Sequence, residues 1–234
     1  MNAGPLILSI ETATDVCSVC VAQGMHVLAF RETTEGRAHA SKITVFAEEV
    51  MRQAEKKFTD LDAVAVSMGP GSYTGLRIGV SAAKGLCFAL DIPLIAIPTL
   101  QAMATGMRKM LDDADTEITL LCPAIDARRM EVYSSVFDLS CREIRETRAE
   151  IIDGNSFGEY LSESVVVFAG SGSEKIKGLL HHHPHAKFLH SFQPSAINMV
   201  TLAENKFGAA AFEDTAYFEP RYLKEFVATP PKKP

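Results

Sequence analysis

The glycine-rich segment Gly69-Pro-Gly-Ser-Tyr-Thr-Gly-Leu-Arg77 contains the residue types best suited to binding a ligand. It joins an expected strand to an expected helix, so its backbone amides could hold an anion at the helix N-terminus. It is not a Walker loop, because no Lys-Ser/Thr pair follows the glycines, and it does not fit G-x-G-x-x-G. The alternative is a tight turn that only begins a helix.

Other residue types that can react or bind metal are present, but their spacing does not bring them together into a site. The histidines of His181–His185 suggest metal ligands, but Pro184 interrupts them and no nearby carboxylate or cysteine completes a ligand set, so a solvated loop is expected. Asp126-Ala-Arg-Arg129 ends an expected strand and could position a ligand, and an exposed salt-bridged turn is the alternative. No spacing brings a nucleophile to a base, so we predict no catalytic residues.

Composition and charge exclude several classes of protein. The 234 residues carry a formal net charge of −6, whereas a protein that binds nucleic acid alone usually has a basic patch. If RNA is the substrate of the system, another subunit is therefore expected to hold most of it. No apolar run reaches the roughly 18 residues of a membrane span, and the N-terminus lacks a secretory pattern, which predicts a cytoplasmic protein. The five cysteines are expected as reduced thiols, with Cys17 and Cys20 on opposite faces of a strand.

The elements that must position these residues follow a repeated order. The first half reads βββαβαβα and the second half appears in the same order. Expected strands are Leu6–Ile10, Cys17–Ala22, His26–Glu32, Ala63–Ser67, Leu94–Ile97, Thr119–Ile125, Glu131–Asp138, Arg142–Glu146, Val165–Ala169 and Ala186–His190; expected helices are Ala40–Lys57, Thr74–Leu90, Pro98–Leu111, Asn155–Leu161, Ser173–Leu180 and Ser195–Phe212.

This order predicts an α/β protein with the duplicated, ribonuclease-H-like layout of actin, Hsp70 and sugar kinases. We expect an N-terminal lobe at residues 1–111, a C-terminal lobe at 117–212, and a tail at 213–234 whose end is disordered. The boundary between the lobes is expected in the acidic stretch Asp112–Thr116.

The expected helix Thr74–Leu90 is apolar on nearly every side and must therefore be covered on every side. Gly75, Gly79 and Ala83 recur every four residues, which lets a second helix approach closely. We predict an interface with a partner protein, against the alternative that the chain's own helices bury the surface. The predicted interface residues are Ile43, Val50, Gly75, Ile78, Gly79, Ala82, Ala83 and Leu86.

The expected layout also suggests positions for a nucleotide. Glu11 follows the first strand, where actin-like ATPases carry an acid near metal-bound phosphate. Gly170 and Gly172 follow a strand of the second half, where the same architecture contacts adenosine. The alternatives are a solvated acid and an ordinary turn.

With these residues in view, the chain resembles the TsaB family, also called YeaZ. The motifs that carry the resemblance occur in order along nearly the whole chain, and the glycine segment is the most specific of them. They are Leu6-Ile-Leu-Ser-Ile-Glu-Thr-Ala-Thr14, Gly69-Pro-Gly-Ser-Tyr-Thr-Gly-Leu-Arg-Ile-Gly79, Ala83-Lys-Gly-Leu86, Ile97-Pro-Thr-Leu100, Asp126-Ala-Arg-Arg-Met-Glu-Val-Tyr133 and Pro220-Arg-Tyr-Leu223.

The resemblance implies a non-catalytic subunit in tRNA threonylcarbamoyladenosine biosynthesis. Such proteins pair through their first two helices with a TsaD-like catalytic subunit. With a TsaE-like ATPase they support threonylcarbamoyl transfer to adenosine 37 of ANN-decoding tRNA. The catalytic relative binds metal through two histidines four residues apart, where this chain has Thr99 and Met103.

We therefore expect no cofactor in the isolated chain, ATP and metal in the partner subunits, tRNA contact through the complex, and a homodimer when the chain is alone. A small-molecule kinase or a metallopeptidase-like enzyme of the same superfamily is the alternative function.

Overall fold

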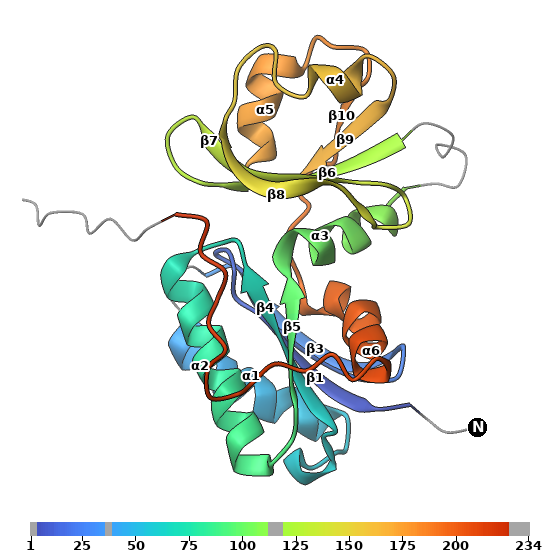
Figure 1. The fold of residues 1–234 in the computed structure, drawn as a ribbon. Coiled ribbons are helices and arrows are strands. Elements are labelled where there is room, and N and C mark those ends of the chain that lie inside the picture. The colour runs from blue at the N-terminus through green and yellow to red at the C-terminus, as the bar shows by residue number, and fades with distance from the viewer. Residues whose placement is uncertain (1–3, 36–38, 112–118, 225–234) are drawn as a thin grey trace, which may run out of the picture.

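The computed structural model describes residues 4–35, 39–111 and 119–224, apart from the side chain of His39, and arranges them as two lobes, each built on a five-stranded sheet (Figure 1). The expected boundary at Asp112–Thr116 and the end of the tail from residue 225 lie outside the described residues. Two mixed sheets covered by helices confirm the α/β class and the duplicated layout. No helix among the described residues is both long and apolar enough to cross a membrane.

The first sheet has the order β3-β2-β1-β4-β5. Its strands are β1 (Leu6–Glu11), β2 (Cys17–Gln23), β3 (His26–Thr33), β4 (Ala63–Gly69) and β5 (Leu94–Pro98). The first three form an antiparallel meander, and β4 and β5 extend the sheet in parallel with β1. Cys17 and Cys20 are buried in the cores on opposite faces of this sheet, which confirms that they pack separately.

The second sheet repeats this topology in the order β10-β9-β6-β7-β8. Its strands are β6 (Thr119–Asp126), β7 (Glu131–Phe137), β8 (Glu143–Ile151), β9 (Val165–Ala169) and β10 (Ala186–Phe188). β6 to β8 form the antiparallel meander, and β9 and β10 run parallel to β6. Each strand of the first sheet therefore has a counterpart in the second.

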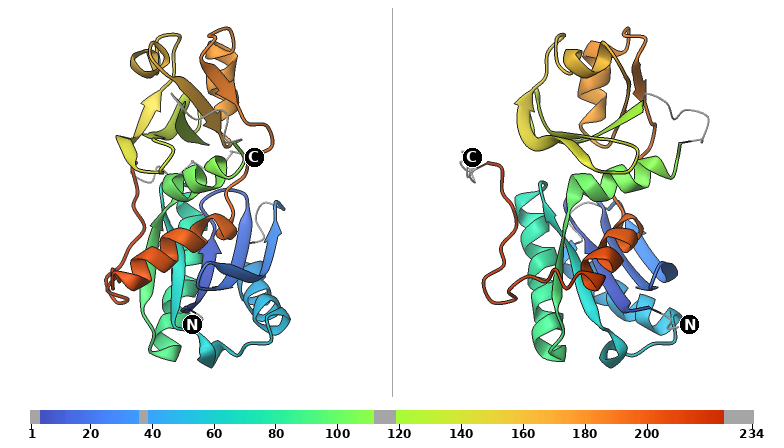
Figure 2. Two further views of the ribbon diagram at one scale, coloured as in Figure 1. Left: turned by 90° about the vertical axis from the view of Figure 1, so that its right-hand side faces the viewer. Right: turned by 45° about the vertical axis from the view of Figure 1, so that its right-hand side comes forward.

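Helices cover both faces of each sheet (Figures 1 and 2). The α-helices are α1 (His39–Gln53), α2 (Tyr73–Leu90), α3 (Thr99–Arg108), α4 (Gly158–Leu161), α5 (Ser173–Leu180) and α6 (Val200–Gly208), with the 3-10 turns η1 (Phe58–Asp60) and η3 (Ala196–Met199). α1 and α2 share one core with the first sheet, and α4 and α5 share another with the second.

The remaining helices, α3 and α6, are exchanged between the lobes. α3 places Leu100, Met103 and Met107 in a core with β6, β7 and β9, although it precedes all of them in the sequence. η3 and α6 place Met199 and Val200 against β1, β4 and β5. The division at 1–111 and 117–212 is therefore corrected. Because each lobe's own helices cover only one face of its sheet, the other face is buried by a helix from the other half of the chain.

Several element ends also differ from the expected ones. α1 ends at Gln53 and α3 at Arg108, while β8 continues to Ile151. The last expected helix, Ser195–Phe212, divides into η3 and the shorter α6. These differences lie at element ends, where local pattern is least decisive.

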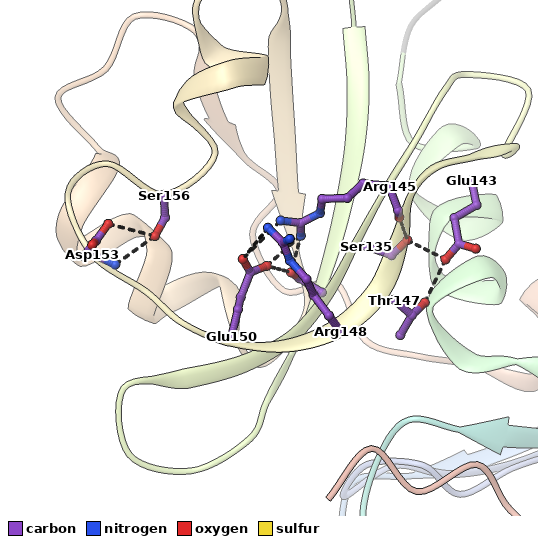
Figure 3. Close-up of polar contacts among 9 residues, drawn as sticks. Ser135, Glu143, Arg145, Thr147, Arg148, Glu150, Asp153 and Ser156 are labelled. Atoms are coloured by element: carbon purple, nitrogen blue, oxygen red, sulfur yellow. Dashed lines mark hydrogen bonds and ion pairs between the residues drawn. The ribbon is translucent and has the colours of Figure 1, made fainter.

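Polar side chains stabilise the curved hairpin β7–β8 of the second lobe (Figure 3). Arg145 is 7% exposed, and its guanidinium donates to Glu150 Oε1 at 2.6 Å and to Ser134 Oγ at 2.6 Å. It also lies over the ring of Phe157 at 4.8 Å. A buried arginine requires such pairing, because an unpaired buried charge costs several kcal/mol. We interpret this cluster as structural.

Candidate functional site

The glycine segment fixes the start of α2 against the turn that follows β1. Ser72 caps the helix by accepting a hydrogen bond from Gly75 N at 3.2 Å, and Ser72 N donates to Ala13 O at 2.7 Å. A Cβ at Gly75 would lie 2.2 Å from Thr12 O, and one at Gly79 would lie 2.2 Å from Thr12 Oγ1. These glycines therefore allow α2 to approach its own sheet, which corrects the prediction that they face a partner helix.

The predicted interface residues divide into two groups. Val50 and Ala83 are buried in the chain's own core, so with Gly75 and Gly79 they cannot form a partner surface, and Ile43 is also buried, at the base of the hollow described below. The other predicted residues, Ile78, Ala82 and Leu86, are partly buried at the edge of that core.

A different set of side chains forms the outer surface of α2. Ser81, Gly85 and Phe88 are exposed, and Phe88 is 87% exposed. Between α1 and α2 lies a shallow hollow whose lining residues are Ala40, Ile43, Thr44, Arg77, Ile78, Ser81 and Ala82. We call the exposed residues of α2 and this hollow the α1–α2 face. An exposed phenylalanine beside small side chains is a surface to which another helix can pack.

Glu11 does not occupy an open phosphate site. Its side chain is fully buried, and its Oε1 accepts a hydrogen bond from Ala13 N at 2.6 Å. Among the described residues, Glu11 Oε2 and Thr12 Oγ1 have no hydrogen-bond partner. The close contact with Gly71 and Gly75 fills the space over this turn. The structure therefore places Glu11 inside the core, and the expectation of either a phosphate-side acid or a solvated one is corrected.

The environment of Glu11 predicts a pH-dependent stability. Burial raises the pKa of Glu11 to about 7, although hydrogen bonds from Ala13 and Ser67 oppose the shift. Folding therefore favours the protonated acid: this contribution is complete below the unfolded pKa of about 4.5 and is lost as the pH rises through 7.

We expect Glu11→Gln, which cannot ionise, to lose less stability than the wild type between pH 5 and pH 8. Over this pH range the free energy of unfolding of the wild type should fall by about 2–3 kcal/mol more than that of the variant, because one unit of pKa shift corresponds to about 1.4 kcal/mol. Urea unfolding of both proteins at several pH values measures it. Parallel pH profiles would show that Glu11 does not titrate in this range.

The second pair of candidate nucleotide contacts is also closed. A Cβ at Gly170 would lie 2.4 Å from Ala124 O and 2.5 Å from Met103 Cε, and Gly172 N donates to Ala124 O at 3.0 Å. Gly170 and Gly172 thus pack tightly on β6 and α3, which agrees with the alternative of an ordinary turn rather than an adenosine contact.

The two positions at which the resemblance expects the metal ligands of the catalytic relative, Thr99 and Met103, are both buried. Thr99 Oγ1 accepts a hydrogen bond from Gly69 N. His185 lies in the loop that follows α5, and its Nδ1 is 2.7 Å from Leu161 O. Within residues 4–35, 39–111 and 119–224, no group of three histidine, cysteine or acidic side chains is placed to hold a metal ion.

Sequence reasoning missed the C-terminal strap, which we define as residues 213–224. It starts beside β5, where Glu213 bridges Leu94, and then runs along α2 (Figure 1). Phe218 enters the core beneath α2, and Lys84 Nζ donates to the carbonyl oxygens of Ala216 and Phe218. Phe218 is the one buried residue of the strap, and a single buried aromatic residue is too short a pattern to predict this packing.

The strap then reaches the second lobe. Arg221 N donates to Met68 O at 2.7 Å, and the rings of Tyr222 and Tyr73 lie 4.6 Å apart. Lys224 Nζ donates to Ala127 O on the turn between β6 and β7 at 3.2 Å, and it pairs with Glu131, the first residue of β7. The strap therefore connects the start of α2 with that turn, which Lys175 also fixes through an ion pair with Asp126.

Two stacked lobes with matching sheets and exchanged helices define a protein of the actin-like ATPase class. The structure of YeaZ from Pseudomonas aeruginosa has the same fold, with a TM-score of 0.80 at 23% identity, covering 94% of this chain and 100% of that one. The model of the family described as TsaD, tRNA N6-adenosine threonylcarbamoyltransferase, matches residues 32–231, and the chain belongs to this family.

Curated relatives confirm the resemblance to TsaB. The tRNA threonylcarbamoyladenosine biosynthesis protein TsaB of Escherichia coli is 37% identical over 127 residues, which are 54% of this chain and 52% of that protein. TsaB of Haemophilus influenzae is 32% identical over 160 residues, which are 68% of this chain and 63% of that protein. The chain thus matches between half and two-thirds of the length of these relatives.

Proposed function

We propose that this chain is the non-catalytic subunit that supports a TsaD-like catalytic subunit in threonylcarbamoyl transfer to adenosine 37 of ANN-decoding tRNA. The observation that carries the proposal is the exposed α1–α2 face, with Phe88 in solvent beside Ser81 and Gly85. A surface of this kind is stabilised when a second helical surface removes it from water, by about 25 cal/mol for each Å² of apolar area.

The non-catalytic role is supported by the positions that would have to do chemistry. Glu11 lies in the core, and Gly170 and Gly172 pack against β6, so the places where an actin-like enzyme holds nucleotide are filled by protein. Thr99 and Met103 offer no ligand set for a metal. These observations disfavour the kinase and metallopeptidase alternatives. ATP and metal in this proposal belong to the TsaD-like and TsaE-like partners.

The α1–α2 face also accounts for the homodimer proposed for the isolated chain. When the catalytic partner is absent, two copies can bury the same surface around a two-fold axis. The catalytic partner then competes with the second copy for one surface, so homodimer and heterodimer exclude each other. The proposal places this assembly in the cytoplasm, where tRNA is modified.

Reconstitution tests the proposal. We expect the purified chain alone to transfer no threonylcarbamoyl group to tRNA, and the mixture with a TsaD homologue from the same organism, a TsaE homologue and ATP to do so. A pull-down should show that the chain binds the TsaD homologue directly. Omission of this chain should remove the activity. Full activity without it, or transfer by the chain alone, would contradict the proposal.

A further inference from the structure

Arginine and tyrosine side chains from three separate parts of the sequence meet where the strap passes between the lobes. We call this region the Arg–Tyr strip and define it as residues 73–77 of α2, the turn 126–133 and the strap segment 219–224. The guanidinium of Arg77 lies 5.3 Å from the ring centre of Tyr73, and the rings of Tyr73 and Tyr222 lie 4.6 Å apart with their planes tilted by 33°. Lys224 Nζ lies 5.7 Å from the ring centre of Tyr133, so the contacts continue onto the second lobe.

The strip differs in charge from the rest of the chain. Its cations are Arg77, Arg128, Arg129, Arg221 and Lys224, and its acids are Asp126, Glu131 and Glu219. Five cations less three acids give +2, in a chain whose formal net charge is −6.

Two of the three acids are ion-paired, one with a lysine outside the strip and one with Lys224, which the count of +2 already includes. Asp126 pairs with Lys175, and Glu131 pairs with Lys224. The side chains of Arg128, Arg129 and Arg221 are exposed. With these two pairs set aside, the strip keeps four arginines, and Glu219 is the acid that belongs to neither pair.

We propose that the Arg–Tyr strip binds single-stranded RNA, namely the loop of the tRNA substrate, and this rests on the function proposed above. Bases stack on aromatic rings and on guanidinium planes, while exposed arginines pair with phosphates. Three partly buried tyrosines, one of them with Arg77 over its ring, supply aromatic surface, and the exposed arginines supply positive charge. An acidic peptide would pair with the cations but would not use the exposed parts of the tyrosine rings, so the observations favour RNA.

The position of the strip fits an auxiliary contact. The strap segment is anchored to backbone carbonyl groups of both lobes: the backbone Arg221 N donates to Met68 O, and the side-chain Lys224 Nζ donates to Ala127 O. The strap segment that carries Arg221 is thus fixed to both lobes. Because the whole chain is acidic, the strip can add to RNA binding by a complex but cannot supply most of it.

The test uses the chain assembled with its TsaD-like partner and a stem-loop RNA carrying an ANN-decoding anticodon. The variant Arg128→Asn/Arg129→Asn removes two cations, and asparagine tolerates the positive φ of 70° and 50° at these positions. We expect the affinity to fall about tenfold, and the slope of log affinity against log salt to decrease by about 1.4, because each phosphate contact to a single strand contributes about 0.7.

Matched variants separate charge, stacking and folding. Arg142→Asn/Lys187→Asn removes two exposed cations elsewhere on the second lobe and should leave affinity and slope unchanged. Tyr222→Leu removes the aromatic ring and should weaken RNA binding about tenfold with an unchanged salt slope. Tyr222→Phe keeps the ring and should bind RNA with wild-type affinity. Thermal melting and partner pull-down should be unaffected by the arginine variants.

Wild-type affinity and slope in the Arg128/Arg129 variant would overturn the inference, including the case in which the strip binds an acidic peptide instead. Failure of the wild-type complex to modify tRNA would contradict the proposed function itself. The two failures are therefore distinguishable.

Discussion

Gly85→Glu should abolish binding of the TsaD-like subunit, with at least a 100-fold loss of affinity, while the chain remains folded. Gly85 lies on the exposed side of α2, and a Cβ built there meets nothing within 4 Å. The substitution therefore costs the monomer nothing in sterics and improves helix propensity. In a complex closed over the α1–α2 face, the carboxylate would be buried without a partner, which costs about 3–5 kcal/mol.

The control for this prediction is Gly178→Glu. Gly178 also lies in a helix, α5, and its Cβ position is equally open, but it belongs to the second lobe. Affinity measured by calorimetry and tRNA modification should be lost in the first variant and retained in the second. If Gly85→Glu binds the partner with wild-type affinity, the assignment of the α1–α2 face is wrong.

Neighbouring alanines extend the same test. Ala82 is partly exposed beside the hollow, whereas Ala83 is fully buried in the core. Ala82→Glu should therefore resemble Gly85→Glu, and Ala83→Glu should unfold the chain because it buries an ion among apolar side chains.

Gly75→Ala should destabilise the protein by about 3 kcal/mol, although the exchange adds one methyl group to a helix. The new Cβ would lie 2.2 Å from the carbonyl oxygen of Thr12, a backbone atom that cannot rotate away. Relief requires α2 to shift from the turn after β1, which also breaks the hydrogen bond from Ser72 N to Ala13 O. Urea unfolding followed by circular dichroism measures the loss.

Gly85→Ala is the matched exchange in the same helix and should have the opposite sign. With open space around the Cβ, only the helix propensity changes, and alanine is favoured by about 1 kcal/mol. Equal effects at Gly75 and Gly85 would mean that α2 does not depend on its close contact with Thr12.

The sequence by itself determined the class of fold and most of its elements. The spacing of three residues on a strand predicted that Cys17 and Cys20 would point to opposite faces of the sheet, and they do. The repeated element order predicted two equivalent sheets, which the strand orders confirm. These features follow from local periodicity, which is set by backbone geometry and does not depend on distant contacts.

Only the tertiary structure decided which surface each side chain contacts. The same four-residue spacing of Gly75, Gly79 and Ala83 suits a partner helix or the chain's own sheet, and contact with Thr12 shows that the sheet occupies it. Glu11 at a strand end could have been solvated, yet α2 closes over it. The exchange of α3 and α6 and the path of the strap depend on contacts between residues far apart in sequence, which no local pattern records.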